Sequence, residues 1–408
     1  MSTGQARVAV IGAGQAGLAT SFELNRAGVE HVVLERGRIG ATWRRRWDSF
    51  CLVTPNWTVQ LPGGVYDGDD PDGYMPRDEI VLFLERYAAS FAAPVQEDTE
   101  VESLEPERAG GFGLRIADGS EIRADAVVVA TGAYQRPHRP AAAAALPDGL
   151  ARLDADDYRN ERALPSGPVL VVGSGQTGCQ IAEELVDAGR EVFLSCGRAP
   201  WVPRRTGGRD VLWWLVETGY LDAPLESLPD RSHRLVSNVL TTGKDGGHDL
   251  HLRVLRAKGV TLLGRFARVE EGRLHFAADL GESVAWGDDR YRQFRELVLG
   301  LARTRDLPEP ALPDLDLFDS RPPQTLDATT LGAVVFAGGF RPDYERWLRL
   351  PGGFDDLGFP VHENGESLAA PGLFFVGVHF LRTRKSSLLY GVGEDAALVA
   401  ATIAQRVT

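Results

Sequence analysis

Two stretches of the chain show the same succession of apolar and polar positions. In each, a short apolar run, beginning at Val8 or at Val169, meets a glycine-rich turn, and apolar residues then recur at helical spacing before a second apolar run. This order predicts a strand, a helix and a second strand, the βαβ unit. The stretches align without a gap as far as Glu35 and Cys196, so the chain contains a twofold internal repeat.

The pattern predicts further elements outside the repeats. Apolar positions at helical spacing predict a helix over 77–91, and alternation broken by glycine turns predicts a hairpin over 101–122. The similar stretches 124–137 and 332–343 each predict a buried strand that ends in a glycine turn. Near the C-terminus, a strand over 373–377 precedes a helix that starts at Ser386. The expected fold class is α/β, with two Rossmann-like, three-layer domains.

Two connectors divide the chain of 408 residues, one rich in proline and alanine (136–149) and one proline-rich and acidic (307–323). They predict a discontinuous first domain, residues 1–163 and 315–408, with a second domain, 164–314, inserted into it. Within the second domain, residues 206–258 are rich in tryptophan and leucine, which predicts a helical insertion whose position the sequence leaves open.

Each repeat carries the spacing GxGxxG after its first strand and before its helix, the context in which this pattern binds dinucleotides rather than forming an ordinary tight turn. The first glycine allows the turn, the second lets the backbone approach a pyrophosphate, and the third lets helix and strand pack closely. The phosphates then lie at the positive end of the helix. The candidate loop residues are Gly12, Gly14, Gln15, Ala16 and Gly17, and Gly173, Ser174, Gly175, Gln176, Thr177 and Gly178.

The repeats differ where the second strand ends. Glu35 ends the first, and a carboxylate there accepts hydrogen bonds from a ribose diol and repels a 2′-phosphate. Cys196 takes this place in the second repeat, next to Ser195 and close to Arg198, so the repulsion is absent and a guanidinium is near. We expect the first site to bind FAD and the second NADPH. The alternatives are an exposed strand end for Glu35 and a solvated surface arginine for Arg198.

The charge and composition of the chain limit the kinds of partner, location and chemistry that we expect. A formal net charge of −13 argues against nucleic acid or an anionic membrane as the main partner. No signal segment precedes the first strand and no apolar run approaches the length of a membrane span, so we expect a cytoplasmic protein. The three cysteines show no CxxC spacing, which argues against disulfide exchange. His248 and His251 lack further ligands nearby, so no metal site is predicted.

Six motifs occur in order along the chain: GAGQAG, GATWRRRWDSF, GYMPRDEIVLFLERYA, VVVATGAY, VVGSGQTG and GLFFVGVHFLRTRKSSLLYGVGEDAALVA. Together they resemble the flavin-containing monooxygenases and related class B flavoprotein monooxygenases over nearly the whole chain. The resemblance implies tightly held FAD, NADPH as hydride donor and O₂ as co-substrate. It also implies a flavin C4a-(hydro)peroxide that oxygenates a small soluble substrate, by N- or S-oxygenation or by oxidative decarboxylation of an α-keto acid.

The resemblance also implies residues that contact the flavin. Asn56 aligns with an asparagine at the flavin C4a edge, and the alternative is that it caps the turn after Pro55. Amides at the start of the C-terminal helix would bond the flavin pyrimidine carbonyl. The other implied cofactor contacts are Arg36, Thr42, Trp43, Thr131, Gly132, Leu388 and Leu389.

Several nearby side chains have two interpretations. Trp43 and Trp57 could each pack beside the flavin or could simply belong to the hydrophobic core. Of the three consecutive arginines at 44–46, one could bind a pyrophosphate; the alternative is that all three are exposed to solvent. His379 faces the flavin or is a hydrogen-bonded structural histidine, and Ser387 stands where relatives commonly have glycine.

One departure from the family pattern affects function. The family motif F-x-G-x-x-x-H-x-x-x-(Y/F) keeps only Tyr158 here, and Asp154 takes the place of the histidine. This histidine helps to couple nicotinamide binding to the flavin site. Two alternatives to the monooxygenase therefore stay open: an NADPH-dependent flavin reductase or oxidase that releases H₂O₂, and a nucleotide sensor without turnover. The sequence also does not identify the substrate or decide whether the protein is a homodimer.

Overall fold

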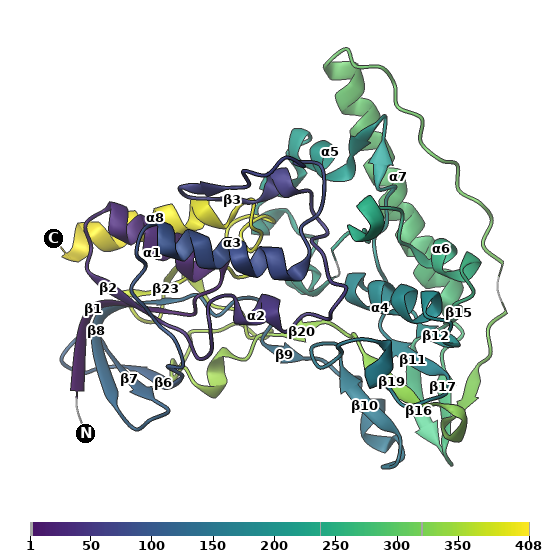
Figure 1. Cartoon of the computed structure of the whole chain (residues 1–408), viewed down its shortest axis with the longest axis horizontal. Helices are drawn as coiled ribbons and strands as arrows, with labels where there is room; N and C mark the ends of the chain where they lie inside the picture. Colours follow the sequence, from purple (N-terminus) through teal and green to yellow (C-terminus); the bar gives the residue numbers. More distant parts are fainter. Residues whose placement is uncertain (1–2, 237, 320, 408) are drawn as a thin grey trace.

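The computed structural model describes residues 3–236, 238–319 and 321–407. The chain forms two lobes, each built on a parallel sheet (Figure 1). The first lobe holds both termini and lies on the left of Figure 1. Its parallel strands are, in spatial order, β23 (Leu373–Phe375), β8 (Glu121–Val129), β1 (Thr3–Ile11), β2 (His31–Leu34) and β5 (Val95–Gln96).

Two layers cover the first sheet. On one face pack α1 (Gln15–Arg26), α3 (Arg77–Ser90) and α8 (Val392–Val407). On the other face lie the antiparallel strands β6 (Val101–Pro106) and β7 (Phe112–Ile116), which continue into β8. The strands β21 (His362–Glu363) and β22 (Glu366–Ser367) extend the edge beside β23. The predicted helix over 77–91 and the hairpin over 101–122 are confirmed.

The second lobe has a five-stranded, all-parallel sheet. Its order is β10 (Ala151–Asp154), β19 (Ala333–Phe336), β11 (Val169–Val172), β12 (Val192–Ser195) and β15 (Thr261–Leu263). The helices α4 (Gln176–Asp187), α6 (Leu252–Ala257) and α7 (Leu280–Thr304) pack on one face. The antiparallel strands β16 (Phe266–Glu270), β17 (Arg273–Phe276) and β18 (Thr325–Asp327) cover the other. Both lobes thus have the expected three layers.

Sheet membership departs from the predicted boundaries at 163/164 and 314/315. Strands β10 and β19 belong to the second sheet, although residues 151–154 and 333–336 lie outside the predicted second domain. The reason is that β19 pairs with β11 as β8 pairs with β1, so the two similar stretches complete different sheets. The chain crosses between the lobes through two short strands, β9 (Arg136–Pro137) and β20 (Phe340–Arg341), which pair with each other.

Two other predicted elements are corrected. The C-terminal helix begins at Val392, because residues 386–391 form consecutive turns. The insertion over 206–258 is not one helical unit but holds a small hairpin, two short helices and several 3-10 turns. These pieces are β13 (Arg205–Thr206), β14 (Arg209–Asp210), α5 (Val211–Glu217), η4 (Tyr220–Asp222), η5 (Leu225–Ser227), η6 (Arg231–Leu235), η7 (Lys244–Gly246) and α6.

The remaining short elements are α2 (Ala41–Arg44), η1 (Asn56–Thr58), β3 (Gln60–Leu61), β4 (Gly64–Val65), η2 (Ala141–Ala145), η3 (Glu161–Ala163), η8 (Ala328–Thr330) and η9 (Tyr344–Arg346). Among the described residues, none of the helices combines the length and the apolar character needed to cross a membrane.

Candidate functional site

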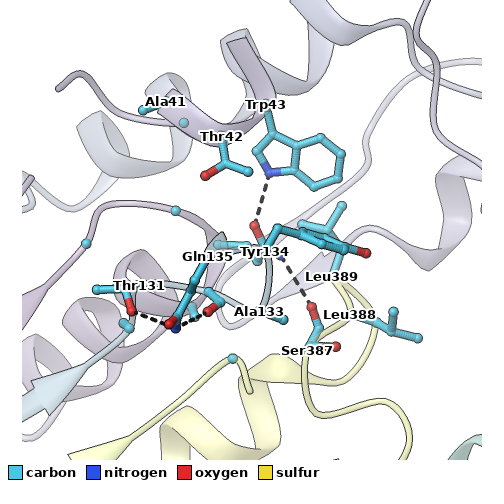
Figure 2. A pocket seen from close by; sticks show the side chains of 18 of the residues that line it. Ala41, Thr42, Trp43, Thr131, Ala133, Tyr134, Gln135, Ser387, Leu388 and Leu389 are labelled. Carbon is cyan, nitrogen blue, oxygen red and sulfur yellow. Dashed lines mark hydrogen bonds between the residues drawn. The ribbon is translucent and has the colours of Figure 1, made fainter. Parts of the chain in front are cut away.

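A cavity of about 730 Å³ starts at the carboxyl ends of the first sheet and reaches the space between the lobes. Segments that follow β1, β2, β8 and β23 all line it, which is where open α/β sheets bind their ligands. Figure 2 shows part of this lining, which comes from α2, from the turn after β8 and from the C-terminal turns. The second lobe contributes residues from α4, α5 and the segment after it.

The first glycine loop has the geometry of a phosphate cradle. A Cβ on Gly17 would lie 1.8 Å from the Gly12 carbonyl oxygen, so the close approach of helix and turn requires glycine there. A Cβ on Gly14 would meet nothing within 4 Å, so the space beside that backbone is open. Helix α1 has no side-chain cap and no acid in its first turn, and its N-terminal amides therefore suit a pyrophosphate. Gly12, Gly14, Gln15 and Ala16 line the cavity.

Glu35 lies at the rim of this cradle and is 6% exposed. Its carboxylate accepts a hydrogen bond from Ala13 N at 2.7 Å and another from Gly37 N at 3.0 Å. The strand end is therefore tied to the glycine loop, and the side chain still lines the cavity beside Arg36. This placement counts against an exposed strand end and fits a ribose acceptor.

The second glycine loop repeats the same geometry. A Cβ on Gly178 would lie 1.8 Å from the Gly173 carbonyl oxygen, so the close approach of helix and turn requires glycine here too. Helix α4 also lacks a side-chain cap and an acid in its first turn. Of this loop, Gln176 and Thr177 line the cavity. The residues present thus fit a second dinucleotide.

The rim of the second cradle carries no carboxylate. Cys196 is fully buried, and burial raises the pKa of its thiol to about 12. Ser174 Oγ bonds to Gly197 O (3.1 Å) and accepts from Gly197 N (3.0 Å). Ser195 Oγ donates to Gly264 O and accepts from Phe266 N, so both hydroxyls are engaged within the protein. Arg198 is exposed just beyond the strand end and is not among the residues that line the cavity, so its contact with a 2′-phosphate stays a prediction.

A chain of hydrogen bonds crosses the first part of the cavity (Figure 2). Trp43 Nε1 donates to Gln15 Oε1 at 3.0 Å, and Gln15 Nε2 donates to the Ser387 carbonyl at 3.3 Å. The Ser387 hydroxyl lies 2.9 Å from His379 Nδ1. Burial lowers the pKa of His379 to about 4, so this ring is neutral at pH 7. Thr42, Trp43, Thr131, Gly132, Ser387, Leu388 and Leu389 all line the cavity, whereas His379 lies behind Ser387.

Asn56 has a different placement. Its side-chain oxygen accepts from Met75 N at 2.7 Å and its amide donates to Asp70 O at 2.9 Å. The side chain thereby ties the 3-10 turn η1 to the loop that leads into α3, and Asn56 is not among the lining residues. This favours a structural role for Asn56, but not as a cap of the turn after Pro55, because that turn has no side-chain cap and the amide bonds to the loop instead. Trp57 packs edge-on against Tyr390, with ring centroids 6.0 Å apart, and also does not line the cavity.

The arginine run divides between two roles. Arg44 pairs with Glu85 on α3. Arg46 lines the cavity, lies 5.0 Å from the centroid of the Tyr134 ring, and pairs with Asp156 at 3.4 Å. Because Arg46 is buried at the edge of the cavity, its position fits the predicted role as a phosphate partner better than the alternative of a solvent-exposed arginine.

Asp154, which replaces the motif histidine, makes a bidentate contact with Arg139 at 2.7 and 3.0 Å. Arg139 follows β9 in the crossing between the lobes, and Asp154 ends β10, so the pair spans that crossing. The hydrogen bond that Arg139 donates to the Asp154 carboxylate raises the pKa of Arg139. The substituted position therefore still makes a polar contact across the hinge, but through an ion pair.

Several lining residues were not predicted from the sequence. Thr99–Glu102 follow β5, Tyr134 and Gln135 follow the glycine turn after β8, and Arg346 ends η9, with Trp347 directly after it. Thr99 N donates to the Glu35 carbonyl at 2.8 Å, which places that segment at the ribose rim. Tyr134 ends the motif VVVATGAY, which could have identified it, whereas the others follow short or irregular elements with no motif of their own.

Two glycine cradles whose residues line one cavity are the arrangement expected of a protein that binds two dinucleotides. Residues 9–215 match the family model described as pyridine nucleotide-disulphide oxidoreductase. An uncharacterized CzcO-like oxidoreductase of Geobacillus kaustophilus is 32% identical over 95% of both chains. The indole-3-pyruvate monooxygenase YUCCA1 of Oryza sativa subsp. japonica is 30% identical over 76% of this chain and 79% of its own.

Among solved structures, the flavin-containing monooxygenase from Stenotrophomonas maltophilia is similar in fold, with a TM-score of 0.69, 19% identity and coverage of 99% of this chain and 100% of that one. The chain belongs to the pyridine nucleotide-disulphide oxidoreductase family. It is an oxidoreductase whose cofactors are FAD and NADPH.

Proposed function

We propose that the protein is an NADPH-dependent flavin monooxygenase that transfers one atom of O₂ to a small molecule. The balanced reaction is substrate, O₂, NADPH and H⁺ to oxygenated substrate, NADP⁺ and water. One observation carries the proposal: residues of both glycine cradles line a single cavity, and the strand ends beside the two cradles differ, with Glu35 at the first and no acid at the second. The relative named as a monooxygenase supports the same reaction class.

The chain's own residues supply binding, orientation and exclusion of water. Bound FAD would supply the electron transfer from NADPH to O₂. Gln15, held between Trp43 and Ser387, fixes the wall of the cavity where Figure 2 shows the C-terminal turns facing α2. Leu388 and Leu389 add apolar surface to that wall. A fixed, largely dry wall favours oxygen transfer over loss of H₂O₂.

Disulfide reduction, which the family name includes, finds no support in the cysteines. Cys179 and Cys196 are fully buried, and burial raises the pKa of both thiols. Cys51 is half-buried and its pKa is raised to about 11 for the same reason. All three are free, so the chain presents no reactive thiolate pair. We also propose that neither nucleic acid nor an anionic membrane is the main partner, because the formal net charge is −13. A cytoplasmic location stays a prediction.

The test measures NADPH consumption, O₂ consumption, H₂O₂ and oxygenated product together, with sulfides, amines and keto acids as substrates. The proposal predicts product in near-equal amount to the NADPH consumed. NADPH oxidation with equivalent H₂O₂ and no product would instead establish the reductase or oxidase alternative. Failure of NADPH to reduce the FAD-loaded protein would contradict both.

A further inference from the structure

Two buried arginines of the second lobe contact segments of the first. Arg204, the first of them, follows β12 and is 1% exposed. Its backbone belongs to the second lobe, because its N–H donates to Asp249 Oδ1 at 2.6 Å and its carbonyl accepts from Val211 N at 2.9 Å. Its side chain reaches the first lobe, where Nη1 donates to the Val53 carbonyl at 2.7 Å and Nε donates to Tyr74 Oη at 2.9 Å.

The first-lobe segment that Arg204 contacts is part of the cavity wall. Leu52, Val53 and Thr54 all line the cavity. Leu52 N donates to the Met75 carbonyl at 2.8 Å, and both of these residues belong to the core of the first lobe. This part of the wall is therefore built by the first lobe and held by a guanidinium of the second.

The surroundings of Arg204 are closely fitted. Asp210 is 5% exposed, and its Oδ2 lies 2.7 Å from Arg204 Nη2 and 2.7 Å from Tyr74 Oη. Burial raises the pKa of Tyr74 to about 12, so the phenol keeps its proton at pH 7 and donates to the carboxylate. A Cβ on Gly243 of the second lobe would lie 2.1 Å from the Leu52 carbonyl oxygen. The lobes thus approach each other more closely here than a side chain at position 243 would permit.

A second arginine, Arg234, makes a similar contact from the cross-domain arm, which is our name for residues 219–235. The arm follows α5 and contains η4, η5 and η6. Arg234 is 5% exposed, and its Nε and Nη2 donate to the His379 carbonyl at 3.1 and 2.8 Å. Its guanidinium carbon lies 3.7 Å from the centroid of the Phe359 ring. His379 Nδ1 lies 2.9 Å from the hydroxyl of Ser387, which lines the cavity, so Arg234 holds a second part of the first-lobe wall.

The burial of these two arginines has a consequence for the position of the lobes. A buried guanidinium loses its hydration, and that cost is offset only when its hydrogen-bond partners lie at the right distance. For Arg204 and Arg234 those partners include backbone carbonyls of the other lobe. The contacts therefore favour one relative position of the lobes. Each glycine cradle lies with its strand end inside one lobe, so this position sets how the two cradles face each other.

We infer that Arg204 and Arg234 are positioning residues, which fix the place of the nicotinamide nucleotide in the second cradle relative to FAD in the first. The inference rests on the reduction of FAD by NADPH, which is part of the proposed function. That step moves one hydride, with its two electrons, from NADPH to FAD and leaves NADP⁺. Neither arginine is among the residues that line the cavity. We therefore expect both to affect the rate of hydride transfer and not the affinity for either nucleotide.

The first experiment compares Arg204→Met with Arg205→Met in the FAD-loaded full chain, by anaerobic stopped-flow reduction with NADPH. Methionine keeps apolar length and removes the donors, and Arg205 is the exposed neighbour. We expect Arg204→Met to lower the limiting rate of flavin reduction by about 10-fold or more, the scale expected when reacting groups are slightly misplaced. The NADPH concentration that gives half the limiting rate should stay within about threefold, because the second cradle is unaltered. Arg205→Met should leave both values within about twofold.

Two further variants extend this comparison. Tyr74→Phe removes one acceptor from Arg204 and keeps the ring whose centroid lies 4.4 Å from the guanidinium carbon. It should lower the limiting rate less than Arg204→Met does, and it tests the contact even if Arg204→Met does not fold. Arg234→Met tests the second contact, with Arg231→Met, an exposed arginine of the same arm, as its control. We expect a lower limiting rate in Arg234→Met alone of this pair.

The second experiment measures amide hydrogen exchange, which reports the contact without turnover. Arg204→Met should speed exchange in the peptide that contains residues 52–54 and leave exchange in the first glycine loop, residues 12–17, unchanged. Arg205→Met should change neither peptide. Equal exchange in the 52–54 peptide of Arg204→Met and of the unaltered chain would contradict the contact.

The outcomes separate a positioning role from a role in stability. An unaltered limiting rate in Arg204→Met and Arg234→Met would overturn the inference. Loss of FAD from these variants, with the remaining flavin reduced at the unaltered rate, would also overturn it, because the arginines would then act on stability alone. Failure of NADPH to reduce the unaltered protein would instead contradict the proposed function, and the exchange measurement would still decide whether Arg204 holds the wall.

Discussion

The two glycine cradles share their backbone and differ in their rims. In the first, Gly12 N bonds to the Leu34 carbonyl at 2.8 Å, and in the second, Gly173 N bonds to the Ser195 carbonyl at 3.0 Å. The side chain that joins the loop to the strand end, however, comes from opposite partners in the two cradles. In the first cradle a carboxylate from the strand end, Glu35, accepts from the loop, whereas in the second a loop hydroxyl, Ser174, bonds to Gly197 beyond the strand. The shared backbone predicts where a pyrophosphate would lie in each cradle. The side chain that joins the loop to the strand end determines whether a carboxylate is present to bind the ribose.

The helices behind the cradles differ in a similar way. Phe22 on α1 packs against the rings of Tyr87 and Phe91, at centroid distances of 6.0 and 5.3 Å. The aligned residue on α4 is Glu183, which bonds to His248 at 2.8 Å and pairs with Lys258 at 3.0 Å. At this aligned position the first helix makes aromatic contacts and the second makes ionic ones, although both helices also bury apolar side chains. The contact at Glu183 should therefore respond to pH where the contact at Phe22 does not.

We expect the largest effect from substitution of the third glycine in each cradle, Gly17 or Gly178. Gly17→Ala and Gly178→Ala each place a Cβ within 1.8 Å of a backbone oxygen, which should cost about 3 kcal/mol of stability or of cofactor binding. Gly17→Ala should yield protein without FAD. Gly178→Ala should keep its FAD but fail to be reduced by NADPH. Flavin content and anaerobic reduction measure both, and loss of FAD in both variants alike would break the assignment of one nucleotide to each cradle.

The rim acid gives the next effect. Glu35→Ala removes two hydrogen bonds to backbone amides as well as the ribose acceptor, and charged hydrogen bonds are worth about 1.5–3 kcal/mol. We expect FAD to bind at least about 10-fold more weakly, measured by equilibrium dialysis of the refolded apoprotein. Glu35→Gln, which keeps an acceptor, should lose less. An unchanged FAD affinity in Glu35→Ala would show that the acid does not contact the nucleotide.

The second rim is tested by the choice between two nicotinamide nucleotides. Arg198→Ala should weaken NADPH by about 1.5–3 kcal/mol, the value of a charged hydrogen bond, and hardly change NADH. Arg303→Ala, which removes an exposed arginine from α7 of the same lobe, is the matched control and should change neither. Reductive half-reaction kinetics with both nucleotides measure the difference. Equal losses for NADPH and NADH would show that Arg198 does not contact the 2′-phosphate.

The smallest effect concerns pH. The hydrogen bond to Glu183 raises the pKa of His248 above its ordinary value. A raised pKa means that the stabilisation is complete below the ordinary histidine pKa, about 6.5, and is lost as pH rises through the folded value. His248→Gln should therefore lower stability by about 1 kcal/mol or less at pH 6, because the ring is partly exposed, and by less at pH 8.5. Thermal unfolding at both pH values checks this, and a constant difference would contradict it.

Much of the fold could be predicted from the sequence because it depends on local patterns. The repeat, the glycine turns, the helix of 77–90 and Glu35 at the rim all rest on residues close together in the chain. Sheet membership was harder, because the stretches 124–137 and 332–343 look alike and only long-range pairing assigns β19 to the second sheet.

The site was predicted less completely for the same reason. Whether a serine at the second rim contacts a ligand depends on Gly197 for Ser174 and on Gly264 and Phe266 for Ser195, which lie 23 to 71 residues away. The arm had no motif of its own, and its position follows from contacts such as that of Arg234 with the His379 carbonyl. Contacts of this length have no signature in local composition.

The most direct test is an anaerobic titration of the purified, FAD-loaded protein with NADPH and, separately, with NADH. We expect loss of the oxidised flavin absorbance with about one equivalent of NADPH, and a much weaker response to NADH, because the second strand end lacks an acid and is followed by Arg198. Protein that takes up no FAD, or flavin that NADPH fails to reduce, would contradict the assignment of two different nucleotides to the two cradles.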